Sequence, residues 1–150
     1  ERCEVLLVND YNRLNYRTMN QHDSHKIRVM VVDDTDVVRR GLRIALETFD
    51  DMILVGEAAN GKEAVELVPR LKPDIILMDL VMPVMDGIRA TEIISKAYSD
   101  TKVVVLTSTT DMDMIHAALA KGAASYLLKT LSLIELEAAI HLAYESELSR

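Results

Sequence analysis

The feature that most constrains the fold of this chain is a regular alternation between two kinds of segment, which begins near residue 27. Short runs of apolar, often β-branched residues recur five times, and each is followed by a longer segment with helical spacing of its apolar residues. Strands that alternate with helices form a parallel sheet covered on both faces. We therefore predict a doubly wound (βα)5 α/β fold. The predicted strands are 27–32, 52–58, 74–78, 102–106 and 123–128, and the predicted helices are 35–48, 60–70, 87–98, 111–121 and 132–148.

Local signals support several helix boundaries. Asn60 and Ser132 each stand three residues before a glutamate, which is the arrangement of a helix N-cap. Pro73 and Gly122 stand where a helix is expected to end. In the last helix one apolar face is expected, formed by Leu133, Leu136, Ile140 and Tyr144.

Polar residues follow four of the five apolar runs. They are Asp33 and Asp34 after the first run, Asp79 after the third, Thr107 after the fourth and Lys129 after the fifth. Ligands of open α/β sheets bind just beyond the carboxyl ends of the strands, so these side chains should meet in one crevice. Each residue alone has an ordinary explanation as a cap or a solvated charge. Together they predict a functional site.

The residue types at these strand ends indicate phosphate chemistry. Three carboxylates in one place repel each other and raise one another's pKa unless a cation neutralises them. Oxygen ligands without histidine or cysteine suit Mg²⁺. Lys129 and Thr107 can contact phosphate oxygens. The sequence thus predicts a Mg²⁺-dependent phosphoryl transfer in which Asp79 is the nucleophile and forms an acyl phosphate.

Charge and composition narrow the functional class further. The 150 residues carry 24 acidic and 17 basic side chains, and the net charge of −7 lies entirely in residues 27–150. This excess disfavours nucleic-acid binding by the chain itself. The only cysteine is Cys3, and neither a signal peptide nor an apolar run of about 18 residues is found, so we expect a cytoplasmic location without membrane insertion. Residues 1–26 are expected to be a poorly ordered extension and 27–150 the functional domain.

Four motifs make residues 27–148 resemble the receiver domain of two-component response regulators, a CheY-like domain of flavodoxin-like fold. The motifs are Val31-Val32-Asp33-Asp34, Asp79-Leu80-Val81-Met82-Pro83-Val84-Met85-Asp86-Gly87, Thr107-Ser108 and Tyr126-Leu127-Leu128-Lys129. The segment 122–129 resembles the NarL-type branch, whose members usually carry a C-terminal helix-turn-helix domain. An effector domain that regulates transcription is therefore expected beyond residue 150.

The resemblance implies specific roles at the strand ends. Asp79 would accept a phosphoryl group from a sensor histidine kinase. The Mg²⁺ ion would be bound by Asp34, by Asp79 and by the carbonyl of Val81, with Asp33 acting through water. The protein would be a phosphoacceptor rather than an enzyme in the ordinary sense.

The resemblance also implies a conformational switch. Thr107 and Lys129 would contact the phosphoryl group, Tyr126 would follow Thr107 inward, and the helix at 111–121 with the strand at 123–128 would form the output face. Val81 and Thr109 would tune dephosphorylation. Phosphorylation would be expected to promote a homodimer. DNA would be contacted only through the effector domain.

Three alternatives stay open at this point. The chain could be a stand-alone receiver that acts by protein–protein contact. It could be an aspartyl-nucleophile phosphatase, although such enzymes generally need a second acid two residues after the nucleophile, where Val81 stands. A nucleotide- or flavin-binding module is disfavoured because no phosphate-cradling glycine motif occurs. Many receivers have a proline after the lysine, whereas Thr130 follows Lys129, so the geometry of that peptide bond is undecided.

Overall fold

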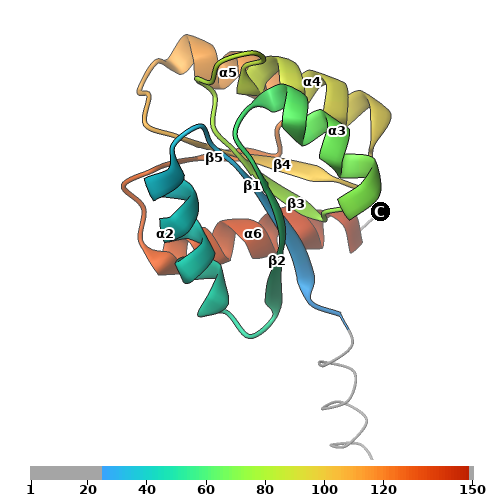
Figure 1. The fold of residues 1–150 in the computed structure, drawn as a ribbon, viewed down its shortest axis with the longest axis vertical. Helices are drawn as coiled ribbons and strands as arrows, with labels where there is room; N and C mark the ends of the chain where they lie inside the picture. Colours follow the sequence, from blue (N-terminus) through green and yellow to red (C-terminus); the bar gives the residue numbers. More distant parts are fainter. Residues whose placement is uncertain (1–24, 149–150) are drawn as a thin grey trace, which may run out of the picture.

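The computed structural model describes residues 25–148. Most of the predicted N-terminal extension, including Cys3, therefore lies outside the described residues. Strands and helices alternate strictly along the chain (Figure 1). In order, they are β1 (Ile27–Val32), α2 (Asp36–Glu47), β2 (Met52–Ala58), α3 (Gly61–Leu71), β3 (Ile75–Met78), α4 (Gly87–Ala97), β4 (Lys102–Thr107), α5 (Met112–Ala120), β5 (Ser125–Leu128) and α6 (Leu133–Leu148).

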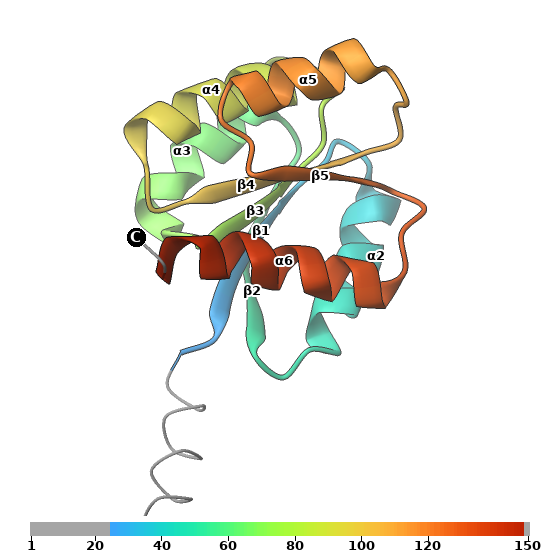
Figure 2. The ribbon, with the colours of Figure 1, turned by 180° about the vertical axis from the view of Figure 1, so that it is seen from behind.

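The five strands form one parallel sheet in the order β2-β1-β3-β4-β5. Helices α3, α4 and α5 cover one face of the sheet, and α2 and α6 cover the other (Figures 1 and 2). The predicted doubly wound α/β fold is confirmed. The strand order reverses direction between β1 and β3, which is where ligands bind in sheets of this kind.

Alternation of side chains along the central strands builds a separate core on each face of the sheet. Val29 and Val31 of β1 pack toward α2 and α6, whereas Met30 and Val32 pack toward α3 and α4. Each large aliphatic side chain buried in this way contributes about 1.5–3 kcal/mol relative to exposure. The two cores hold β1 and β3 rigidly, and these are the strands that carry the carboxylates.

The local signals in the sequence act as predicted at most helix boundaries. The side chain of Asn60 accepts a hydrogen bond from the backbone N–H of Glu63 at 2.9 Å, and Ser132 caps α6 in the same way. The helix before Pro73 ends with Lys72 in the left-handed conformation, and Gly122 has φ +115° after α5. Predicted and observed element boundaries agree within two residues.

Two expectations fail at the margins of the fold. The sequence suggested strands buried on both sides, but the edge strand β5 alternates between half-buried and exposed residues. Successive side chains of a strand point to opposite faces, so the exposed Tyr126 and Leu128 share one face of β5, where the helices cover the edge of the sheet incompletely. In α6, Leu136 and Ile140 are buried as expected, whereas Leu133, in the first turn, is 49% exposed.

The geometry of the peptide bond after Lys129 was left undecided by the sequence. No peptide bond within the described part of the chain is cis, so the Lys129–Thr130 bond is trans. Among residues 25–148, none of the helices is both long enough and apolar enough to cross a membrane.

Candidate functional site

The pairing of β1 with β3 places two aspartates side by side at the carboxyl end of the sheet. Val32 is the register partner of Met78, so the next residues, Asp33 and Asp79, leave their strands together. The backbone N–H of Asp79 donates to the carbonyl of Val32 at 2.9 Å. The N–H of Asp33 donates to the carbonyl of Ala58 in β2 at 3.1 Å. Both aspartates are therefore fixed by the sheet rather than by a mobile loop.

Asp34 completes a group of three carboxylates. One oxygen from each of Asp33, Asp34 and Asp79 lies within 4.8 Å of the others. Asp33 is 2% exposed and Asp79 is 6% exposed, whereas Asp34 faces solvent. The site thus has a buried floor and one accessible carboxylate at its rim. The structure brings together the three acids that the strand-end pattern singled out.

Lys129 reaches into this group from β5. Its Nζ lies 2.6 Å from Oδ2 of Asp33 and 3.2 Å from Oδ2 of Asp79. The backbone N–H of Lys129 donates to the carbonyl of Thr107 at 2.9 Å, which anchors the residue to β4. Burial lowers the pKa of Lys129, but the hydrogen bond to Asp33 and the charge of Asp79 outweigh burial and raise the pKa above its ordinary value. The ammonium group is therefore held in its charged form.

The ionised form of the Asp79 carboxyl is destabilised by its surroundings. Burial raises the pKa of Asp79, and the adjacent Lys129 offsets only part of that effect, while the charge of Asp33 adds to it. Its Oδ1 also accepts a hydrogen bond from the backbone N–H of Leu80 at 2.8 Å. A further cation near Asp79 would relieve the remaining penalty.

The donor set fits a magnesium ion. All candidate ligands are oxygen atoms, and a hard cation that keeps several waters is bound by one or two carboxylates in this manner. Among the hydrogen bonds between backbone groups in the described residues, none uses the carbonyl of Val81. That oxygen is therefore available as a ligand. The side chain of Val81 is largely exposed.

The hydroxyl and the aromatic residue predicted for the switch lie on neighbouring strands. Thr107 is buried at the end of β4, and its Oγ1 accepts a hydrogen bond from the backbone N–H of Thr109 at 3.2 Å. Tyr126 pairs with Val105 across β4 and β5 and is 40% exposed. Thr107 thus lies at the same end of the sheet as the carboxylates, whereas the ring of Tyr126 is partly exposed to solvent.

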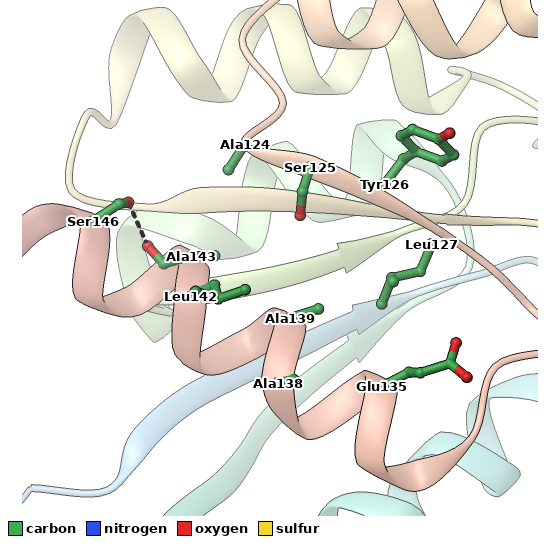
Figure 3. Close-up of a pocket in the computed structure, with 10 residues that line it drawn as sticks. All are labelled: Ala124, Ser125, Tyr126, Leu127, Glu135, Ala138, Ala139, Leu142, Ala143 and Ser146. Atoms are coloured by element: carbon green, nitrogen blue, oxygen red, sulfur yellow. Dashed lines mark hydrogen bonds between the residues drawn. The ribbon is translucent and has the colours of Figure 1, made fainter.

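A groove of about 410 Å³ runs between β5 and α6 (Figure 3). The side chains of Ser125 and Leu127 point toward α6, and the ring of Tyr126 lies on the other side of β5 (Figure 3). On α6 the groove is lined by residues such as Ala139 and Leu142. It belongs to the outer edge of the sheet and is separate from the carboxylates.

The loop from Asp79 to α4 packs tightly against the backbone of Asp79 and Leu80. The backbone N–H of Gly87 donates to the carbonyl of Leu80 at 2.9 Å. A Cβ atom on Gly87 would lie 1.9 Å from the carbonyl oxygen of Asp79. Within the same loop Val84 has φ +67°, which is unfavourable for a β-branched residue. The missing side chain of Gly87 is what allows the loop to pack against Asp79.

Sequence reasoning missed the contacts that two arginines of α2 make with Asp33 and with Glu57. The guanidinium of Arg39 donates to the backbone carbonyl of Asp33 and to the carboxylate of Asp36. Arg39 and Arg43 also flank Glu57 of β2, and Nη2 of Arg43 lies 2.6 Å from its Oε2. The spacing of Asp36 and Arg39, three residues apart on a helix, was the only signal in the sequence for part of this network.

Comparison with known protein families and structures gives a consistent result. Residues 29–141 match the response regulator receiver domain family. Over 121 residues the chain is 48% identical to the transcriptional regulatory protein LiaR of Bacillus subtilis, a match that covers 81% of this chain and 57% of LiaR. It is 45% identical to the response regulator protein VraR of Staphylococcus saprophyticus, covering 81% of this chain and 58% of VraR. The chain therefore spans less than two thirds of the length of these relatives.

Solved structures show the same fold. The response regulator domain of Thermotoga maritima CheB superposes with a TM-score of 0.75 at 35% identity, covering 81% of this chain and 98% of that domain. The receiver domain of the response regulator NarL from Mycobacterium tuberculosis gives a TM-score of 0.74 at 34% identity, with 79% and 97% of the two chains covered.

Proposed function

The chain belongs to the response regulator receiver family, and from this membership we propose that Asp79 accepts a phosphoryl group from a sensor histidine kinase in a Mg²⁺-dependent reaction. The observation that carries the proposal is the group of three carboxylates around Asp79, with Lys129 ion-paired to two of them. A buried carboxylate that has a raised pKa and a neighbouring ammonium group is a good candidate for a functional residue.

The transfer itself is a substitution at phosphorus. A carboxylate oxygen of Asp79 forms the new O–P bond while the P–N bond of a phosphohistidine breaks, and the leaving imidazole keeps the electron pair and takes up a proton. Lys129 places positive charge beside the attacking oxygen and the transferring group. A Mg²⁺ ion, when bound, would supply further neutralisation of the phosphoryl oxygens. The product is an aspartyl phosphate.

The contacts of the three acids support a division of roles toward the ion. Asp33 is engaged by Lys129 and by the backbone N–H of Thr35, so it would act through water. Asp34 faces solvent, and Nζ of Lys129 lies farther from Asp79, at 3.2 Å, than from Asp33, at 2.6 Å. We therefore assign direct ligation to Asp34, to Asp79 and to the carbonyl of Val81.

We assign the response to phosphorylation to the neighbouring strands. An aspartyl phosphate adds about −1.5 to −2 charges to the site. The hydroxyl of Thr107 and the ammonium group of Lys129 would turn toward the phosphoryl oxygens, and Tyr126 would move inward from its half-exposed position. The output face is α5 with β5. Phosphorylation would shift the population of two conformations of this face.

The relatives suggest what the output is. LiaR is a transcriptional regulatory protein, and VraR is a response regulator protein. We propose that this receiver controls transcription in the cytoplasm through a DNA-binding domain that is not part of the chain, with dimerisation on phosphorylation as the intermediate step. In this proposal the receiver is a phosphoacceptor and not an independent enzyme.

Acetyl phosphate can replace the kinase in a direct test. The protein is incubated with acetyl phosphate and Mg²⁺, and its intact mass is measured. We expect one phosphoryl adduct, which should be absent in Asp79→Asn and when the metal is chelated. Asp100→Asn serves as a matched control, because Asp100 is exposed just before β4, at the opposite end of the sheet. An adduct that persists in Asp79→Asn would refute the assignment, and turnover without any adduct would favour a phosphatase.

A further inference from the structure

A second group of metal-binding side chains lies away from the phosphoryl site. Asp51 precedes β2, and Glu137 and His141 lie on α6. One ligand atom from each of these three residues lies within 4.8 Å of the others. We propose that these residues bind a divalent transition-metal ion such as zinc, which links α6 to the connection between α2 and β2.

Regular structure on both sides places the ligands. Glu137 and His141 are four residues apart on α6, so their side chains lie one above the other on the same face of the helix. The carbonyl of Asp51 accepts a hydrogen bond from the backbone N–H of Ile27 in β1 at 2.8 Å, which fixes the backbone opposite the helix. Nε2 of His141 lies 2.7 Å from Oδ2 of Asp51. An ion would replace this hydrogen bond, because the same two atoms would become its ligands.

The electrostatics of the group favour a cation. Asp51 and Glu137 bring two negative charges to one place, and carboxylates at this separation repel each other unless a cation is present. Within residues 25–148, no hydrogen bond or ion pair engages the partly buried carboxylate of Glu137, whereas Asp51 already contacts His141. An ion held by all three side chains would satisfy Glu137 as well. The half-exposed imidazole and the exposed Asp51 leave a path from solvent.

The ligand types select the kind of metal. An imidazole nitrogen with two carboxylate oxygens suits Zn²⁺ and its transition-metal neighbours, whereas Mg²⁺ and Ca²⁺ prefer sets of oxygen atoms only. The Asp33, Asp34 and Asp79 group has oxygen ligands only, so the two groups should take different ions. Three protein ligands leave the fourth position of a tetrahedral zinc ion for water.

The consequence of binding would be local stabilisation of α6. The ion would connect the last helix to the residue just before β2. Both ligand-bearing segments are distant from Asp79 in the sequence. An ion that binds only the folded state raises stability in proportion to the logarithm of its free concentration. The melting temperature should therefore rise steadily with zinc once the site is half saturated.

The test is a zinc titration of the full chain, with excess Mg²⁺ present to compete for the first group of carboxylates. Melting temperature and two-dimensional NMR spectra are recorded during the titration. We expect one ion per chain, an increase of several degrees in melting temperature, and signal shifts centred on Asp51 and on the middle of α6. The zinc-induced change is compared between variants, because His141→Ala also removes the contact with Asp51 and alters the starting stability.

Two variants and one control make the outcome decisive. His141→Ala should abolish the zinc-induced change, and Glu137→Gln should weaken binding at least tenfold while leaving the His141–Asp51 contact intact. His116→Ala, on the exposed surface of α5, should behave like the wild type. Absence of binding to the wild type, or equal binding by wild type and both variants, would overturn the proposal. In the first case the group is only a histidine–aspartate ion pair with a neighbouring glutamate.

Discussion

Gly87→Ala is the substitution that couples the fold most directly to the candidate phosphoacceptor. A Cβ atom at this position would lie 1.9 Å from the carbonyl oxygen of Asp79 and 2.9 Å from Cα of Leu80, whereas Cβ atoms essentially never come closer than 3.0 Å to other heavy atoms. The obstructing atoms are backbone and cannot rotate away. The loop between β3 and α4 must therefore open by about 1 Å, and the carbonyl of Asp79 must shift with it.

The size of the effect follows from this displacement. Overpacking a buried position costs about 1–3 kcal/mol, and a backbone obstacle places the value at the upper end. A loss of about 3 kcal/mol lowers the melting temperature of a domain of this size by roughly 10 °C. A misplacement of about 1 Å at a reacting group can slow a reaction by about a hundredfold. Phosphorylation by acetyl phosphate should therefore slow along with the loss of stability.

Gly41→Ala provides a matched control. Gly41 lies on the exposed side of α2, and a Cβ atom there has no neighbour within 4 Å. Alanine is a better helix former than glycine, so this variant should be more stable by about 0.5–1 kcal/mol. Urea unfolding and the rate of adduct formation by mass spectrometry are measured for both variants. If Gly87→Ala matched the wild type in stability and rate, the close contact with Asp79 would not constrain the site.

Three further outcomes are expected. Val84 is 78% exposed at φ +67°, so Val84→Asn should raise the free energy of unfolding by about 1 kcal/mol without loss of packing, and an unchanged urea midpoint would argue against strain. Val81 has no polar group to orient water, so Val81→Asn should shorten the lifetime of the phosphorylated state, and identical decay of the mass adduct would contradict this role. Burial raises the pKa of Asp79, so its ionised form opposes folding at neutral pH and less so as the pH falls. Asp79→Asn should therefore stabilise the metal-free protein at neutral pH, with a gain that shrinks toward the ordinary carboxyl pKa of 3.8; a gain independent of pH would rule out this cause.

Much of the fold could be predicted because its signals are local in the chain. The apolar runs, the helical spacing and caps such as Asn60 depend on neighbouring residues, and the observed elements agree with them within two residues. The exposure of Leu133 in α6 was not predicted, because its apolar character is the same whether or not a neighbouring element covers it. Periodicity reports which residues share a face and cannot report how far the sheet extends beneath that face.

The candidate site also has some features that the sequence predicts and others that depend on tertiary packing. Its acids could be found in sequence because parallel strands put their carboxyl ends at one edge, so Asp33 and Asp79 had to meet if β1 and β3 were neighbours. The engagement of Asp33 by Arg39 depends on how α2 packs on the sheet, and no spacing encodes it. The same holds for Glu137. It becomes a candidate metal ligand only because the fold brings it close to Asp51, which lies in the connection between α2 and β2.

The sequence by itself therefore determined the alternation of elements and the identity of the strand-end residues, and it predicts Mg²⁺ as the ion that their oxygens would bind. Only the tertiary structure decided which strands are neighbours, how deeply Asp79 is buried and which carboxylate Lys129 approaches most closely. The physical reason is that propensity and periodicity act over a few residues. The distances and the desolvation that set a site's chemistry arise from contacts between segments far apart in the chain.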